Sequence, residues 1–388
     1  MIRNLILIVS VVGVFSSCLY YLFCLWAAAQ FSREADRQHH DVEQKFAPGI
    51  SILKPLKGID PEIYTSFRSH CLQDYPQYEI IFGVSESSDP AIESVKGLQA
   101  EFPQKNIKLV VCEKNIGANV KVSNLAQMLP LAKYEHLIVN DSDIRVPADY
   151  LRRVIEPLHN PGVGMVTCLY RGAAAHTLGS RLEALGISTD FCPSVLLAQQ
   201  LEGGIRFGFG STMAFRRTDL EKIGGFSSIA DYLADDYELG KRIADQGLAV
   251  RLSELVVETY LPPYSLRAFL AHQLRWARGV RDARRSGYLG LIFTFGTFWA
   301  LSALPASWAA GWAWAALAVT LLLRCAIALV VGEKILHDRQ IRKNLWLIPL
   351  RDLLAVAIWV ASLAGNTVTW RGQHFRLANG KLTRIPPR

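Results

Sequence analysis

The 388-residue sequence contains few cysteines, and no two of them form a C-x-x-C pair. The seven are scattered at Cys18, Cys24, Cys71, Cys112, Cys168, Cys192 and Cys325. An odd and unclustered set argues against a disulfide framework and against a structural zinc site. We therefore expect most of the chain to face a reducing compartment.

Charge is also scarce, since charged residues make up 20 % of the chain and hydrophobic residues 51 %. This composition differs both from the charge-rich profile of a disordered chain and from that of an ordinary soluble enzyme. It fits a soluble domain averaged with membrane-embedded segments. The net charge of +8 suits an anionic lipid or substrate. Because no nucleic-acid-binding motif is present, we expect no nucleic-acid partner.

Residues 4–30 carry no charge at all. A helix over this run is long enough to cross a bilayer. The hydrophobic region of a cleaved signal peptide is shorter, about 7 to 15 residues, and ends at small residues. Here the run ends at Phe31, Arg33 and Glu34 instead. We therefore predict a transmembrane anchor over residues 1–32.

A second membrane region is expected over residues 288–366. Its first two apolar runs cover residues 288–309 and 311–332. Pro305 and Gly311 punctuate them, which predicts a helical hairpin. The same length and apolar character that mark the anchor mark these runs as candidates for membrane insertion.

Charges interrupt this region in two places. Arg324 lies in the second run, and the Arg351-Asp352 pair lies in a third apolar run over residues 345–365. Charge inside a membrane is costly and is usually paired or faces protein. Basic residues precede the third run and also fill a basic tail over residues 367–388, so both flanks have a cytoplasmic signature. The third run therefore crosses the membrane, re-enters it or lies in its interface, which leaves two or three helices here.

Residues 48–280 have a different character. Short β-rich runs, which we predict to be strands, cover residues 49–53, 79–84, 107–111 and 136–140. Helical stretches lie between them at residues 61–73, 90–102 and 122–132. This alternation predicts an α/β domain with a mostly parallel, Rossmann-like sheet. Ligands of such sheets bind beyond the carboxyl ends of the strands, so the residues that follow each strand are candidates for chemistry.

Two carboxylates, Asp141 and Asp143, directly follow the last predicted strand, with one residue between them. Hard oxygen ligands suit Mg²⁺ or Mn²⁺ holding a diphosphate. The alternative is a solvated turn that caps the next helix. Their place at a strand end favours the functional interpretation.

A second acidic motif, Asp235-Asp236-Tyr237, opens a predicted helix. Acidic residues are ordinary helix caps, but one of these carboxylates could also take a proton from an acceptor hydroxyl. The glycine-rich stretch at residues 207–212 lies upstream and could bring the backbone close to a ligand or simply form a turn.

A third motif, HQLRW at residues 272–276, precedes the second membrane region and continues into further arginines. It could be a basic interfacial helix. Alternatively, Arg275 neutralises a departing diphosphate and Trp276 packs on the acceptor or the nucleotide.

Six segments, in this order, resemble the ceramide glucosyltransferase family of membrane-bound GT-A glycosyltransferases. They are SILKPLKGIDP (51–61), QDYPQYEIIFGVSESSDPAI (73–92), GANVKVSNL (117–125), VNDSDIRV (139–146), LADDY (233–237) and HQLRW (272–276). The resemblance covers about residues 48–280, and the closing TWRGQHFRL also matches. It implies that residues 48–280 form a GT-A catalytic domain.

The family's three separated aspartates fall on Asp89, Asp141 and Asp236. The resemblance implies that Asp89 contacts the nucleotide and that Asp236 is the catalytic base. Asp143 completes a DxD with Asp141, and the two would hold the metal, Mg²⁺ or Mn²⁺. The animal ceramide enzymes carry glycine at the position of Asp143.

The family's (Q/R)xxRW signature falls on Arg275 and Trp276, which the resemblance makes catalytic. Its first position is His272, neither Gln nor Arg, and Gln273 stands one place away, so the contact made at that position differs. Other positions that the resemblance implies bind the nucleotide sugar, by a weaker match, are Lys54, Lys57, Asn119 and Lys121.

The implied activity is inverting transfer of a hexosyl unit from a UDP-sugar to a hydroxyl of a membrane lipid. Residues 143–172 look closer to a bacterial hopanoid branch, which implies N-acetylglucosamine transfer to bacteriohopanetetrol; glucose transfer to ceramide is the alternative. A processive polysaccharide synthase shares the motifs but needs more membrane helices. A non-catalytic scaffold needs none of these aspartates. Because UDP-sugars are cytoplasmic, we expect a multi-pass inner (cytoplasmic) membrane protein whose catalytic domain faces the cytoplasm.

Overall fold

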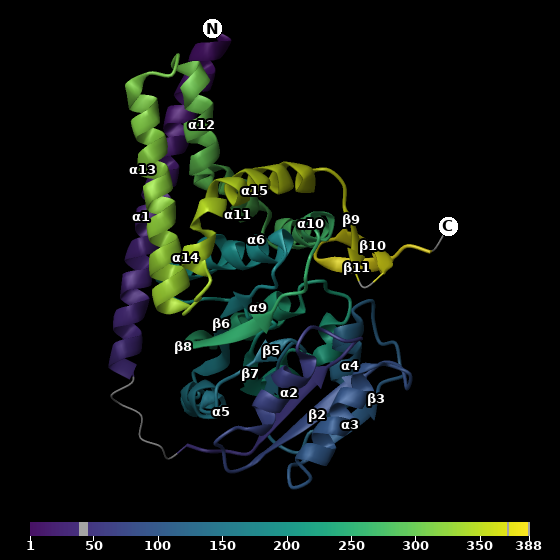
Figure 1. Ribbon diagram of the computed structural model, residues 1–388. Helices are drawn as coiled ribbons and strands as arrows, with labels where there is room; N and C mark the ends of the chain where they lie inside the picture. Colours follow the sequence, from purple (N-terminus) through teal and green to yellow (C-terminus); the bar gives the residue numbers. More distant parts are fainter. Residues whose placement is uncertain (39–45, 371, 387–388) are drawn as a thin grey trace. The chain divides into compact units, whose positions relative to one another are not determined.

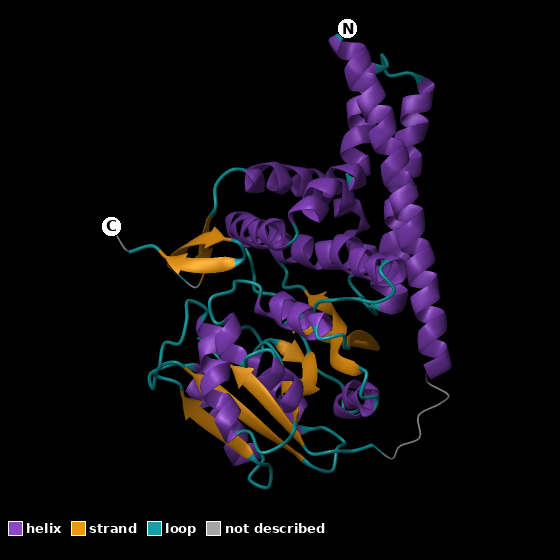
Figure 2. Ribbon diagram, turned by 180° about the vertical axis from the view of Figure 1, so that it is seen from behind, coloured by secondary structure: helices purple, strands orange, loops and turns teal. Residues whose placement is uncertain are grey.

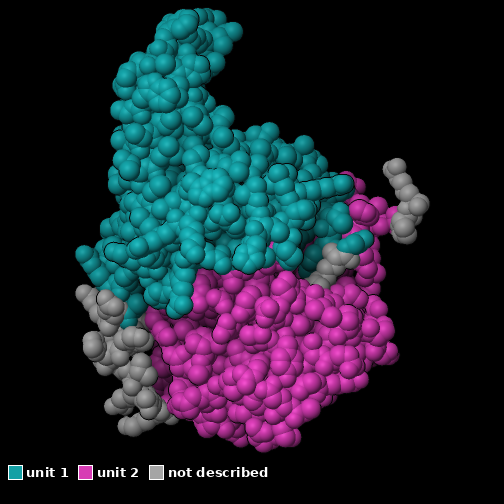
Figure 3. All heavy atoms as spheres, viewed as in Figure 1, with its two compact units in different colours: residues 1–37, 174–200, 263–372 teal, residues 38–173, 201–262, 373–388 magenta. Residues whose placement is uncertain are grey.

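The computed structural model describes residues 1–38, 46–370 and 372–386. Its two compact units are coloured separately in Figure 3. Unit 1 holds residues 1–37, 174–200 and 263–372, and unit 2 holds residues 38–173, 201–262 and 373–388. Arg371 and the last two residues of the expected basic tail lie outside the described residues.

Unit 2 is built on an eight-stranded sheet with the order β3-β2-β1-β4-β7-β6-β8-β5. Its strands are β1 (Ile50–Pro55), β2 (Tyr78–Val84), β3 (Ile107–Val111), β4 (His136–Val139), β5 (Ile144–Arg145), β6 (Val163–Ala173), β7 (Met213–Arg216) and β8 (Ala249–Tyr260). The first four are parallel, and β7 pairs antiparallel with β4 and β6. The predicted mostly parallel sheet is thus confirmed, strand by strand, in its first half.

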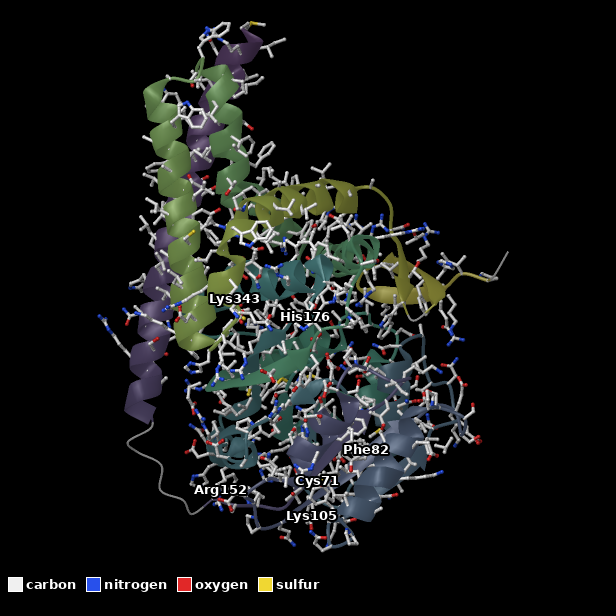
Figure 4. The ribbon with its side chains drawn as sticks, in the orientation of Figure 1. Cys71, Phe82, Lys105, Arg152, His176 and Lys343 are labelled. Atoms are coloured by element: carbon white, nitrogen blue, oxygen red, sulfur yellow. The ribbon has the colours of Figure 1, made fainter. Side chains whose placement is uncertain are left out.

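Helices connect the parallel strands, as Figure 2 shows by element type. They are α2 (Ile63–Cys71) and α3 (Ala91–Glu101), each inside a predicted helical stretch, and α4 (Val120–Met128), which begins two residues before the predicted stretch 122–132. Every residue of β1 is buried, as expected for a central strand covered on both faces. Phe82 of β2, labelled in Figure 4, packs on Phe67 of α2 with ring centroids 4.6 Å apart.

The second half of unit 2 completes the sheet and its surroundings. It contains α5 (Tyr150–Ile155), α8 (Arg217–Lys222), α9 (Asp235–Asp245), and the antiparallel hairpin of β10 (Gln373–Ala378) and β11 (Lys381–Arg384). The hairpin is tied to the unit through Leu233, whose backbone N–H donates to the Gly380 carbonyl at 3.0 Å.

Unit 1 contains the membrane helices. Three lie side by side in Figure 1: α1 (Ile2–Gln38), α12 (Gly296–Ala306) and α13 (Gly311–Ile327), which a π-helical segment extends to Ile335. Among the described residues, three helices are long and apolar enough to span a bilayer, at residues 2–35, 311–335 and 341–363. A fourth candidate exists only if residues 285–306, bent by 50°, count as one span. The predicted hairpin is the α12–α13 pair.

Unit 1 contains six further α-helices and a strand among the described residues. They are α6 (Leu178–Gly186), α7 (Cys192–Leu201), α10 (Leu266–Ala283), α11 (Arg285–Gly290), α14 (Ile341–Asn344) and α15 (Ile348–Leu363), followed by strand β9 (Thr367–Trp370). Figure 1 shows that α6, α10 and α15 run across the direction of α1 and α13. Leu182, Phe269 and Ile358 pack in one apolar cluster that joins these three helices.

The direction of α15 bears on the third apolar run. A helix that runs across α1 and α13 cannot span the same bilayer in the way that they do. Of the three alternatives for residues 345–365, this orientation favours an interfacial helix. An interfacial helix would leave the basic residues on its two sides on one side of the membrane, as their charge pattern favours.

The buried charges of the membrane helices are paired. Arg324 of α13 donates to the Asp352 carboxylate of α15 at 2.5 and 3.1 Å and to Asp190 at 2.8 Å. The Thr297 hydroxyl of α12 donates to Asp352 at 2.5 Å. These interactions join three helices through groups that could not remain unpaired in an apolar environment.

The unit boundaries differ from the expected catalytic domain at residues 48–280. Residues 174–200 and 263–280 belong to unit 1. Leu182 and Phe269 from these segments pack in one apolar cluster with Ile348 and Ile358 of α15. Helical periodicity alone could not assign these segments, because it gives the direction of an apolar face but not the surface that covers it.

Candidate active site

Asp141 lies at the carboxyl end of β4, where the sheet was expected to place chemistry. Its carboxylate is 2.8 Å from the Lys121 ammonium, and its side chain is 43 % exposed. Its backbone N–H donates to the Gly210 carbonyl at 2.9 Å. A Cβ at position 210 would collide with the Asp141 carboxylate. The glycine-rich stretch forms a turn, in which the Thr212 N–H donates to the Phe209 carbonyl at 3.0 Å, and this turn lies against Asp141.

Lys121, near the start of α4, joins two acidic motifs. Its ammonium contacts Asp235 at 3.0 Å as well as Asp141. Burial acts to lower the pKa of Lys121, but Asp141, Asp235 and Asp236 outweigh it and hold that pKa well above its usual range. The lysine is therefore a permanent cation inside a cluster of carboxylates.

Asn119 fixes the start of the same helix. Its side-chain oxygen accepts from the Val122 N–H at 3.2 Å, which caps α4. Its amide nitrogen donates to the Tyr232 carbonyl at 2.8 Å and reaches Asp235 at 3.4 Å. The predicted residues Asn119 and Lys121 therefore connect the DxD turn with the acidic start of α9.

Asp143 is the second carboxylate of the DxD. It accepts from the Thr259 hydroxyl at 2.5 Å. Burial, reinforced by the charge of Asp141, raises its pKa to about 6. Beneath the turn, the buried Lys54 ammonium donates to the Asp141 carbonyl at 3.0 Å, and burial lowers the pKa of Lys54 to about 7.

Asp236 is half-buried at the first turn of α9, with both carboxylate oxygens held by the backbone. Oδ2 accepts from the Gly210 N–H at 2.9 Å, and Oδ1 from its neighbour Tyr237 N–H at 2.8 Å. Burial, followed by the charge of Asp235, raises the pKa of Asp236 to about 6, although Lys121 opposes the rise. Such a carboxylate is ionised at neutral pH and is more basic than an ordinary aspartate.

Asp89 and Lys57 have other partners in the structure. The Asp89 carboxylate accepts from the Gly58 N–H at 3.1 Å and from the Ala91 N–H at 3.0 Å, so it caps α3 and ties down the loop after β1. Lys57 pairs with Glu86 at 2.7 Å on the surface. The nucleotide roles of Asp89 and Lys57 stay predictions.

The donor set at the DxD suits a divalent cation that a substrate helps to hold. Among the described residues, no cluster of three or more His, Cys, Asp or Glu side chains could bind a metal alone. Asp141 and Asp143 offer two hard oxygen donors whose mutual repulsion a cation would relieve. Mg²⁺ commonly uses one or two carboxylates and completes its shell with phosphate and water.

The third motif lies in unit 1, on α10. His272 Nδ1 is 3.0 Å from the Tyr264 hydroxyl, and its ring stacks on Trp276 at 6.0 Å between centroids. Burial, followed by the charge of Arg275, lowers the pKa of His272 to about 3, so this histidine is neutral. Trp276 is 41 % exposed. The motif thus presents a cation and an aromatic ring, with neutral His272 in its first position.

Sequence reasoning missed three contributors. Gly210 holds both Asp141 and Asp236, Asp235 pairs with Lys121, and Thr259 donates to Asp143. The glycine-rich stretch and the paired aspartates were visible signals for the first two. Thr259 is one hydroxyl in an alternating strand, a position that no spacing distinguishes.

Comparisons with known proteins agree with the motifs. A model of glycosyl transferase family 21 matches residues 9–383. Ceramide glucosyltransferase 3 of Caenorhabditis elegans is 26 % identical over 406 residues, covering 98 % of this chain and 83 % of that protein. A ceramide glucosyltransferase of Komagataella phaffii is 34 % identical over 115 residues, covering 29 % of this chain and 23 % of that protein.

A solved structure shares the fold. The mannosyltransferase PcManGT from Pyrobaculum calidifontis, in complex with GDP-Man and Mn²⁺, has a TM-score of 0.55 and 20 % identity, covering 93 % of this chain and 99 % of that one. Together with the mostly parallel sheet and the apolar helices, this confirms the expected GT-A fold with added membrane helices.

Proposed function

The chain belongs to glycosyl transferase family 21, and from that premise we propose that it moves a hexosyl unit from a UDP-sugar to a hydroxyl of a membrane lipid, with inversion. That it is a glycosyltransferase follows from the family. The observation that carries the proposed chemistry is the Asp236 carboxylate, held by two backbone N–H groups beside the DxD turn.

In this mechanism Asp236 takes the proton from the acceptor hydroxyl. The freed oxygen attacks the anomeric carbon from the face opposite the diphosphate, which inverts its configuration. The raised pKa of Asp236, about 6, makes it a better proton acceptor while leaving it ionised at neutral pH. Lys121, held by Asp141 and Asp235, keeps a positive charge in the same cluster.

The leaving diphosphate needs positive charge. Asp141 and Asp143 would hold Mg²⁺ or Mn²⁺, which neutralises the diphosphate when bound. The DxD offers only two carboxylates, so the nucleotide must help to retain the ion. Arg275 would add a fixed cation, and Trp276 an apolar surface for the acceptor or the nucleotide. Asp89, Lys54, Lys57, Asn119 and His272 would complete the nucleotide-sugar site.

Two donor–acceptor pairs are supported by different observations. The resemblance of residues 143–172 to the hopanoid branch supports UDP-N-acetylglucosamine with bacteriohopanetetrol. The names of the C. elegans and K. phaffii relatives support UDP-glucose with ceramide. Both acceptors are neutral membrane lipids with a free hydroxyl, so the proposed chemistry is the same. A domain that uses cytoplasmic UDP-sugars would face the cytoplasm, at the inner membrane if the cell has two.

The test is a crossed transfer assay on the full chain in detergent. UDP-glucose and UDP-N-acetylglucosamine are each combined with ceramide and bacteriohopanetetrol, with Mg²⁺ or Mn²⁺, and lipid products are identified by mass. The proposal expects one monoglycosylated lipid from at least one pair, and the productive pair identifies the acceptor. A product of many sugar units would indicate a processive synthase instead. Absence of lipid product from every pair, in protein that binds UDP, would contradict the proposal.

A further inference from the structure

Glu183 of α6 is a buried carboxylate directed at the HQLRW motif, with 6 % of its surface exposed. Its Oε2 accepts from the Gln273 side-chain amide at 2.8 Å. Its Oε1 lies 3.9 Å from His272 Nε2. Both oxygens of one side chain thus face two consecutive residues of the motif that precede Arg275 and Trp276.

The far sides of these two residues are also fixed. The side-chain oxygen of Gln273, Oε1, accepts from the Arg351 guanidinium of α15 at 3.1 Å. The His272 ring is held by the Tyr264 hydroxyl and stacks on Trp276 with 24° between ring planes. The orientation of Trp276 therefore depends on His272, which lies between Tyr264 and Glu183.

We propose that Glu183 is a positioning residue for glycosyl transfer: its ionised carboxylate, through Gln273 and His272, holds the turn of α10 that presents Arg275 and Trp276. This inference rests on the proposed function and adds a residue that no motif contains. Loss of the carboxylate charge weakens the hydrogen bond to the Gln273 amide and the attraction to Arg275 and Arg351.

The surroundings of Glu183 place its ionisation near neutral pH. Burial raises its pKa to about 7, while Arg351, the Gln273 hydrogen bond and Arg275 hold the rise in check. The titratable groups that face it are His272 and Arg275 from α10 and Arg351 from α15. His272 stays neutral above pH 5 because its own pKa is about 3. Glu183 therefore changes charge within the working range.

The test is the pH profile of the transfer rate in three variants. In the wild type, protonation of Glu183 near pH 7 should lower the rate about tenfold, and protonation of the base Asp236 near pH 6 should then lower it further. Glu183→Gln keeps an acceptor for Gln273 but mimics the protonated state. We expect a rate about tenfold lower at pH 8 and a single fall near pH 6, without the step near pH 7.

Gln273→Leu provides an independent readout, since it leaves the carboxylate in place and removes a hydrogen bond that lowers its pKa. The step assigned to Glu183 should move to higher pH, on top of a lower rate at every pH because the Gln273 contact itself is lost. This variant decides the question if Glu183→Gln does not fold. The matched control is Glu101→Gln on α3. This change removes a carboxylate that accepts hydrogen bonds from Tyr64 and Arg68 of α2, and it should leave the profile unchanged.

A purely structural Glu183 would give a different result. Glu183→Gln, corrected for the amount of folded protein, would keep the step near pH 7, and Gln273→Leu would not shift that step; these results would overturn the inference. Failure of the proposed function is distinguishable, because the wild type would then bind UDP and form no glycolipid at any pH.

Discussion

At the scale of single residues, the acidic cluster of unit 2 depends on backbone groups that hold its carboxylates in place. Gly210 donates its N–H to Asp236 and accepts from the N–H of Asp141, so one residue positions both the expected base and the DxD. Burial, followed by the charge of Asp235, raises the pKa of Asp236. Asp141, Asp235 and Asp236 together keep Lys121 charged. The cluster is therefore electrostatically coupled, and small displacements should be costly.

Gly210→Ala tests this placement. The new methyl group would collide with the Asp141 carboxylate. We expect transfer to fall at least about tenfold because reacting groups move by a fraction of an ångström. Gly203→Ala is the control, because a Cβ there meets nothing within 4 Å, although its φ of +68° adds backbone strain. Equal activity of the two variants, per folded molecule, would contradict the role of Gly210.

Asp143→Ala tests the metal assignment. The change removes one of two hard oxygen donors, so UDP should bind at least about tenfold more weakly in Mn²⁺, with little change in EDTA. Titration calorimetry with UDP in both buffers measures the difference. Asp149→Ala, an exposed carboxylate before α5, is the matched control. Metal-dependent binding that survives in Asp143→Ala would place the ion elsewhere.

At the scale of elements, sequence patterns predicted what depends on local apolar runs. The strands β1 to β4 and helices α2 to α4 follow from their alternation, and Asp141 could be placed at a strand end without a structure. The assignment of α6 and α10 to unit 1 could not be predicted from the sequence, because it depends on which surface covers their apolar faces. Glu183 and Thr259 were invisible for the related reason that a single polar residue in an amphipathic element has no spacing.

The ion pairs of α13 are also an element-scale feature. Arg324→Met would leave Asp352 buried without its cationic partner, and we expect a loss of about 3–5 kcal/mol of stability. Thermal unfolding in detergent measures the loss. Arg342→Gln removes an exposed arginine that pairs with Glu333 and serves as the control. If both variants unfold at the same temperature as the wild type, the buried network does not stabilise the helices.

At the scale of the whole molecule, the chain combines a nucleotide-sugar fold with apolar helices, as expected for an enzyme whose acceptor stays in the bilayer. The hydropathy of α15 makes it a candidate span, whereas its direction across α1 and α13 favours a place in the membrane interface. Sequence left these alternatives open because apolar length is common to both. The choice fixes the side of the membrane on which the chain continues after α15.

Single cysteines test that choice. Arg339→Cys and Ala364→Cys place a cysteine at exposed positions before and after α15. Trp308→Cys places one in the turn of the α12–α13 hairpin. An impermeant maleimide applied to sealed vesicles should label the first two from the same face. The hairpin turn is expected to react from the opposite face. Labelling of Arg339→Cys and Ala364→Cys from opposite faces would show that α15 spans the bilayer.

The most direct test of the central claim is the transfer rate of Asp236→Asn beside its affinity for UDP. Asparagine keeps the shape of the side chain but cannot accept the acceptor's proton. We predict a loss of about 10²- to 10⁴-fold in transfer, with UDP binding within about twofold of the wild type. Wild-type turnover in Asp236→Asn would contradict the assignment of Asp236 as the base.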